Sequence, residues 1–71
     1  MGFYVYMLRS NSKKSVTYVG YTNDLERRVK QHNSGKGAKF TRGRQWKLIY
    51  KEFFKSKNKA ISREYYIKKN R

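Results

Sequence analysis

The sequence predicts a small α+β domain, a three-stranded antiparallel sheet flanked by helices with the element order β-β-α-β-α. Two segments near the N-terminus and one in the second half are rich in the β-branched and aromatic residues that favour strands. Two other segments place charged residues around an apolar stripe, as surface helices do. Seventy-one residues suffice for one domain with a thin core, so residues 1–71 are expected to form a single unit.

The expected strands are short and separated by polar segments. The first is FYVYML, Phe3–Leu8, and the second is VTYVGYT, Val16–Thr22. They are expected to pair antiparallel across the polar loop RSNSKKS. The third expected strand is WKLIYKEFF, Trp46–Phe54.

The first helix is expected to run from Asp24 to about Asn33. Asn23 is the expected N-cap, and Glu26, three positions later, gives a variant of the capping box. Gly35 is a plausible stop, because glycine accepts the left-handed conformation that ends many helices.

The charge balance points to a polyanionic partner. Nineteen Lys and Arg stand against four acidic residues, a formal net charge of +15, and 17% of the residues are aromatic. A disordered basic tail would lack those aromatics, so we expect a folded domain that binds DNA or RNA through phosphates. An anionic membrane surface is the weaker rival, because no helix pairs a basic face with a bulky apolar one.

The absence of cysteine excludes disulfides and thiolate metal sites, and it fits a reducing, cytoplasmic compartment. No apolar run approaches the roughly 20 residues of a membrane span.

The first helix places two cations unevenly around its axis. At 100° per residue, Arg28 and His32 fall beside the apolar stripe of Leu25 and Val29, whereas Arg27 faces solvent. One interpretation is structural, with Arg28 extending its charge to water and His32 partly buried. The other is that both residues belong to a site.

The last helix is expected to begin at Ser56 or Asn58 and to reach the C-terminus. An apolar stripe centred on Ile61 and Tyr65 would include Glu64, one of only four acidic residues. A salt bridge would explain Glu64 simply, and a metal ligand at the rim of a cleft is the sharper interpretation. If Arg28, His32 and Glu64 face the same sheet, they could converge on one site.

The second strand contains an unusual glycine. Gly20 follows Tyr18 on the same face, and a glycine inside a strand marks a bulge or a close backbone approach. Such an approach could admit a phosphate or a neighbouring side chain.

These residues together carry a family resemblance. The sequence resembles the GIY-YIG nuclease superfamily in a set of motifs that occur in the same order. These are YVY at residues 4–6, YVG at residues 18–20, Arg28 followed by His32 on one helix, and a lone Glu64 on a later helix. The likeness spans nearly the whole chain and is greatest to the small stand-alone bacterial members, relatives of the UvrC incision domain. Tyr4 stands where the family name has glycine. The family often has a polar residue beyond the glutamate helix, and Asn70 lies too close to Glu64 to match it.

The resemblance implies a role for each residue of this set. Tyr6 or Tyr18 would be the general base, or would position the attacking water. Arg28 would stabilise charge on the scissile phosphate. His32 would help to deprotonate a tyrosine or contact phosphate. Glu64 would hold one divalent metal ion, Mg²⁺ or Mn²⁺.

The composition agrees with chemistry that uses one metal. Two-metal cleavage needs several carboxylates around ions about 4 Å apart, and besides Glu64 the chain has only Asp24, Glu26 and Glu52. A tyrosine with a pKa near 10 is a poor base at neutral pH. We therefore expect the metal, Arg28 and the positive field to favour its phenolate.

The basic segment from Ser34 to Gln45 is expected to be a loop that follows the nucleic-acid backbone. Its phosphate contacts would be Lys36, Lys39, Arg42 and Arg44. A solvated surface loop explains each of these residues equally well.

The sequence thus predicts a metal-dependent endonuclease that acts on single-stranded, branched or damaged DNA in repair or recombination. The alternative is a non-catalytic nucleic-acid-binding module on the same scaffold. A basic ribosome-associated protein would explain the charge but not the residue set. The sequence leaves open the oligomeric state and whether a partner protein supplies specificity.

Overall fold

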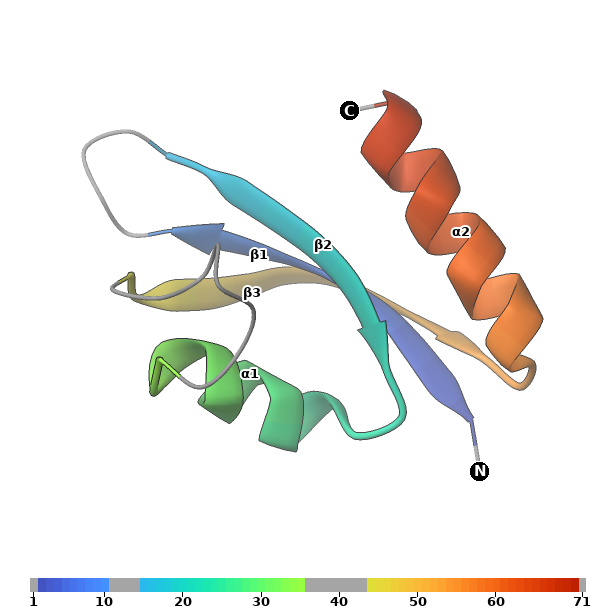
Figure 1. Cartoon of the computed structure of the whole chain (residues 1–71), viewed down its shortest axis with the longest axis horizontal. Coiled ribbons are helices and arrows are strands. Elements are labelled where there is room, and N and C mark those ends of the chain that lie inside the picture. Colours follow the sequence, from blue (N-terminus) through green and yellow to red (C-terminus); the bar gives the residue numbers. More distant parts are fainter. Residues whose placement is uncertain (1, 11–14, 36–43, 71) are drawn as a thin grey trace.

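The computed structural model describes residues 2–10, 15–35 and 44–70. It shows the predicted order β-β-α-β-α, and the expectation of three antiparallel strands with two helices is confirmed (Figure 1). Among the described helices, none is long and apolar enough to cross a membrane. The elements are β1 (Phe3–Ser10), β2 (Thr17–Thr22), α1 (Leu25–Asn33), β3 (Trp46–Phe54) and α2 (Lys57–Asn70).

The sheet has the order β2-β1-β3, with both pairings antiparallel. β1 runs two residues beyond the expected Leu8, because Ser10 closes the hairpin: its N–H donates to the Val16 carbonyl at 2.8 Å, and its Oγ accepts from the Val16 N–H at 3.0 Å. β2 begins at Thr17, one residue later than expected, and β3 has the expected bounds.

The two helices cover opposite faces of the sheet, as Figure 1 shows. Alternation along β1 sends Val5 toward α2, where it is buried with Val19 and Ala60. The next residue, Tyr6, points toward α1 and is buried with Leu8 and Trp46. The core is therefore two small clusters, one on each side of the sheet.

The start of α1 differs from the prediction. Asp24, not Asn23, is the N-cap, and its Oδ1 accepts from the Arg27 N–H at 3.2 Å. Asp24 is held there because its own N–H donates to Thr22 Oγ1 at 3.1 Å. Glu26 does not close a capping box but pairs with Lys30 at 3.4 Å.

The expected stop of α1 is confirmed. The helix ends at Asn33, and Gly35 follows with a φ of 81°, the left-handed conformation that glycine adopts without a Cβ clash. The Gly35 N–H donates to the His32 carbonyl at 3.4 Å.

The buried face of α2 is rotated relative to the prediction. Ala60 is fully buried and Ile67 packs on the same cluster, whereas Ile61 is 38% exposed and Tyr65 is 69% exposed. The small Ala60 side chain lets the helix approach the sheet closely, so the contact stripe centres on it rather than on the larger apolar residues. The prediction that Glu64 lies on the sheet side is confirmed, since its side chain is only 16% exposed.

Candidate active site

Tyr6 is the centre of the candidate site. It is 1% exposed and pairs across β1 and β2 with Gly20. A Cβ on Gly20 would stand 2.7 Å from the Tyr6 hydroxyl oxygen and 2.9 Å from its Cζ, so the ring lies against the bare backbone of the edge strand. The close approach that the glycine signalled is thus made by a neighbouring side chain.

His32 meets the Tyr6 hydroxyl from α1. The distance from Tyr6 Oη to His32 Nε2 is 2.9 Å, and the histidine is fully buried. The Tyr18 ring lies beside both residues, with its centroid 4.9 Å from the imidazole and 6.4 Å from the Tyr6 ring. Three residues expected at the site therefore form one aromatic cluster.

Burial sets the protonation of this pair. It raises the pKa of Tyr6 to about 12, while the guanidinium of Arg28 acts in the opposite direction by hydrogen bonding and charge. Burial also lowers the pKa of His32, and the positive charge of Arg28 lowers it further. At neutral pH the pair is therefore a phenol and a neutral imidazole, which can accept the phenol proton at Nε2.

This result corrects part of one expectation. Arg28 and the positive field do not by themselves make Tyr6 a phenolate, because the desolvation of a buried phenolate outweighs the attraction of Arg28. For Tyr6 to lose its proton, a nearby group must accept it, and His32 Nε2 lies 2.9 Å from the Tyr6 hydroxyl oxygen.

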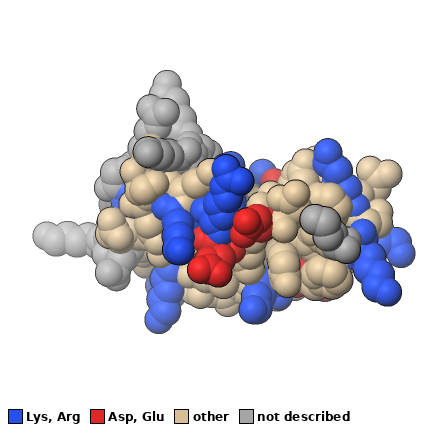
Figure 2. Space-filling view, turned by 90° about the horizontal axis from the view of Figure 1, so that it is seen from below, with Lys and Arg blue, Asp and Glu red and all other residues tan. Residues whose placement is uncertain are grey.

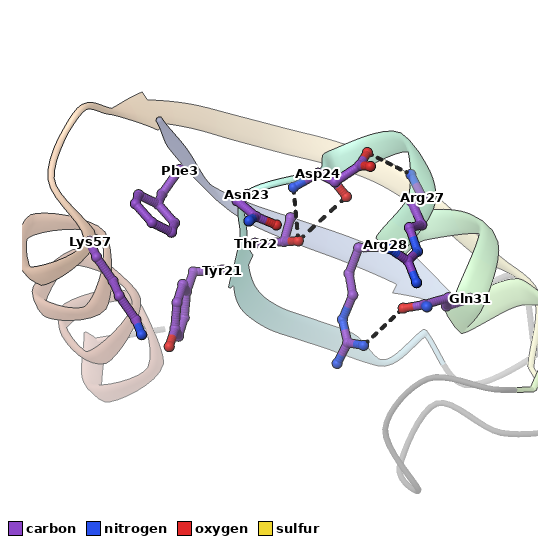
Figure 3. Close-up of a pocket in the computed structure, with 9 residues that line it drawn as sticks. All are labelled: Phe3, Tyr21, Thr22, Asn23, Asp24, Arg27, Arg28, Gln31 and Lys57. Atoms are coloured by element: carbon purple, nitrogen blue, oxygen red, sulfur yellow. Dashed lines mark hydrogen bonds between the residues drawn. The ribbon is translucent and has the colours of Figure 1, made fainter. Parts of the chain in front are cut away.

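Arg28 is held at the mouth of the site. It is half-buried, and its Nη1 donates to Gln31 Oε1 at 3.0 Å. It also lines an open pocket of about 470 Å³ that runs from α1 past β2 to Lys57 at the start of α2 (Figure 3). Arg27 is exposed, as predicted, although it lines another part of the same pocket.

Glu64 approaches from the other face of the sheet. Arg28 and His32 are on α1, whereas Glu64 is on α2, so the three residues pack on the same sheet from opposite faces. The carboxylate of Glu64 is nonetheless near enough to raise the pKa of Tyr6. The residues of the candidate site therefore come from both faces of the sheet.

The Glu64 carboxylate forms an ion pair with Lys68, at 2.7 Å between Oε2 and Nζ. Among the residues that the structure describes, no group of three or more His, Cys, Asp or Glu side chains could hold a metal ion. A single carboxylate still fits Mg²⁺, which keeps several waters and binds through one or two carboxylates and substrate phosphates.

The charges around the site are mixed. Figure 2 shows the face below the sheet, where acidic side chains gather in one group among Lys and Arg. The start of α1 carries Asp24 and Glu26. Asp24 lines the same pocket as Arg28 and Lys57, so a phosphate there would be attracted by the two cations and repelled by Asp24.

Part of the predicted site cannot be placed, and part was missed. Lys36, Lys39 and Arg42 lie outside the described residues, and Arg44 is partly buried just before β3. Two supporting residues were missed: Gln31, which holds Arg28, and Lys68, which pairs with Glu64. Their positions three and four residues away along a helix could have revealed both.

Several known proteins are similar to this chain. The UPF0213 protein CPE1444 of Clostridium perfringens is 58% identical over 67 residues, which cover 93% of this chain and 70% of that protein. The UPF0213 protein YazA of Bacillus subtilis is 52% identical over 68 residues, which cover 94% of this chain and 65% of that protein. This chain thus spans about two thirds of the length of these curated relatives.

A solved structure is also similar. The solution NMR structure of the UPF0213 protein BH0048 from Bacillus halodurans matches with a TM-score of 0.55 and 44% identity, over 100% of this chain and 74% of that one. The family model described as the GIY-YIG catalytic domain matches residues 2–71. The chain therefore belongs to the GIY-YIG family, whose members are generally endonucleases.

Proposed function

We propose that this protein is a metal-dependent endonuclease that hydrolyses phosphodiester bonds in DNA. The observation that carries the proposal is the buried hydrogen bond between Tyr6 and His32, formed beside the guanidinium of Arg28. Family membership and the net charge of +15 support a nucleic-acid substrate. Repair or recombination, in which single-stranded, branched or damaged DNA is cut, is the process that we assign to it.

In this proposal Tyr6 is the general base, and its proton leaves through His32. The phenol is neutral at neutral pH because its pKa is about 12. As water attacks phosphorus, the phenol oxygen takes a proton from the water while its own proton passes to His32 Nε2, 2.9 Å away. The bond from phosphorus to the leaving oxygen then breaks, and that oxygen takes a proton from the solvent.

Arg28 has an electrostatic role. Its guanidinium is always charged and matches the fork of two phosphate oxygens. Gln31 holds it by one nitrogen at 3.0 Å. Arg28 would stabilise the additional negative charge that develops on the phosphate during attack.

Glu64 would hold the divalent metal ion, Mg²⁺ or Mn²⁺. When bound, such an ion supplies Lewis-acid stabilisation of the phosphate and leaving oxygens. Lys68, now paired with Glu64 at 2.7 Å, would hold the carboxylate in its orientation. Tyr18, whose ring lies 4.9 Å from that of His32, would help to orient the imidazole.

One observation favours a second candidate, a nucleic-acid-binding module without catalysis. Tyr6 and His32 are both fully buried, and packing alone would account for them. Such a module would bind the same polyanions.

A cleavage assay separates the two candidates. Wild-type protein is incubated with Mg²⁺ and single-stranded, flapped or four-way-junction DNA, alongside the Glu64→Gln and Tyr6→Phe variants. We expect cleavage by the wild type and a loss of at least about 100-fold in both variants. Equal trace activity in all three proteins would reject the nuclease and leave the binding module.

A further inference from the structure

One face of α2 carries an exposed aromatic side chain between cations. Lys57, Ile61, Tyr65 and Lys68 lie within about 80° of one another around the helix axis. We call these residues the α2 stripe. All are exposed; Tyr65 is 69% exposed, the largest value among the exposed large hydrophobic residues.

Tyr65 lacks the local partners that its neighbour has. The guanidinium of Arg63 lies 5.1 Å from the centre of the Tyr66 ring, and Arg63 also pairs with Glu52 on β3 at 2.9 Å. Within the described part of the chain, the Tyr65 side chain forms no hydrogen bond or ring contact. Burial does not explain its position, so its ring is available to a ligand.

The stripe runs from the pocket that Arg28 lines past Glu64. Lys57, at its first turn, lines the same pocket as Arg28 and stands beside Tyr21 of β2 (Figure 3). Farther along the helix, Glu64 lies between the stripe and the buried residue Ala60. A ligand on the stripe would thus pass directly beside Glu64.

We propose that the α2 stripe binds an unpaired segment of nucleic acid, with one base stacked on Tyr65 and the flanking phosphates near Lys57 and Lys68. The inference rests on the proposed function, because it assigns the form of nucleic acid that reaches that site. The net charge of +15 selects a polyanion. The ring selects an unpaired strand, since bases inside a duplex are already stacked on both sides.

Fluorescence anisotropy of a labelled oligonucleotide, in buffer with EDTA, tests the proposal without cleavage. We expect Tyr65→Ala to weaken binding of single-stranded DNA by about 5- to 100-fold, and Tyr65→Phe to preserve it, because stacking needs the ring and not the hydroxyl. The matched control is Tyr66→Ala, which removes the same side chain from the flank occupied by Arg63 and is expected to change affinity little.

Two further ligands isolate the contribution of the bases. An oligonucleotide of abasic sites should bind the wild type and Tyr65→Ala equally, and a blunt duplex should do the same. Equal losses from Tyr65→Ala on single-stranded, abasic and duplex ligands would overturn the proposal, as would no loss on any of them. Binding through Tyr65 without cleavage would reject the nuclease but keep this inference, whereas cleavage without a Tyr65 effect would do the reverse.

Discussion

The substitution Gly20→Ala tests the geometry on which the candidate site depends. The added Cβ would stand 2.7 Å from the Tyr6 hydroxyl oxygen, 2.9 Å from Tyr6 Cζ and 3.2 Å from Tyr18 Cε2. Ordinary contacts begin at 3.4 Å, so the hydroxyl must move by about 0.7 Å. Tyr6 and its hydrogen-bond partner His32 are both fully buried, which leaves little room for that movement.

The free energy of unfolding should fall by about 1–2 kcal/mol. Overpacking a core costs about 1–3 kcal/mol. Replacing glycine by alanine at a position without positive φ returns roughly 0.4–1 kcal/mol, because the unfolded chain becomes less flexible. Gly20 is such a position, since Gly35 is the glycine with positive φ in the described residues. A shift of 0.7 Å would also lengthen or misalign the 2.9 Å hydrogen bond from Tyr6 to His32.

Urea unfolding and DNA cleavage should be measured on the same preparations. Gly35→Ala is the matched control, because its Cβ would meet no atom within 4 Å while its φ of 81° strains any other residue. That strain costs roughly 1–2 kcal/mol. We expect both variants to lose similar stability, and only Gly20→Ala to lose cleavage.

The double variant Tyr6→Phe/Gly20→Ala gives the refuting outcome. Without the hydroxyl the shortest contact disappears, so Gly20→Ala should cost less stability in the Tyr6→Phe background than in the wild type. If Gly20→Ala keeps full stability and cleavage, Tyr6 does not lie against the β2 backbone as described.

The charges and protonation of the site lead to three other predictions. Arg28→Ala should lower kcat by about 100- to 1000-fold, as the loss of a transition-state donor does. Arg27→Ala should keep kcat and raise only KM. Equal losses of kcat in the two variants would refute this difference between the two arginines. Stability should fall below about pH 6.5, by at most about 1.4 kcal/mol per pH unit, because folded His32 has a lowered pKa and binds its proton less tightly than in the unfolded chain. Stability should also fall between pH 10 and 12, by about 3 kcal/mol, because Tyr6 with a raised pKa holds its proton until the higher pH. Urea unfolding of the wild type and Tyr6→Phe across this range, with an NMR titration of the single imidazole, checks both; a His32 pKa at or above 6.5 would contradict the burial that we describe.

Much of the fold could be predicted from local patterns. β3 has its expected bounds because nine residues of strand-forming composition are enclosed by polar segments. Gly35 could be predicted as the end of α1, since few other residues adopt a positive φ. The N-cap was placed one residue early because Asn23 and Asp24 are both good caps, and only the hydrogen bond from Asp24 N–H to Thr22 decides between them.

The rotation of α2 could not be predicted from its sequence. Its apolar residues surround the helix, so periodicity gives no single buried face. Ala60 decides the contact through its small size, and the ion pair from Arg63 to Glu52 fixes one flank on β3. Both are tertiary contacts, which the sequence of the helix alone does not show.

The candidate site was predictable as a set of residues but not as an electrostatic environment. Helix periodicity placed His32 toward the sheet, where the structure buries it fully. The raised pKa of Tyr6 could not be predicted, because net charge is visible in the sequence and the depth of a side chain is not. Lys36, Lys39 and Arg42 stay predictions.

The burial of Tyr6 and His32 affects how relatives of this protein should be classified. Both side chains are buried in the core of a small domain. A relative that has lost catalysis would therefore still keep them, because folding requires them. Arg28 is half-buried and the Glu64 side chain is 16% exposed, so packing constrains these two residues less than the fully buried pair. A relative that keeps the tyrosine and the histidine but has lost the arginine and the glutamate should therefore be classed with the binding modules. Whether a relative is catalytic would therefore be indicated by residues at the positions of Arg28 and Glu64, and not by the tyrosines in the family name.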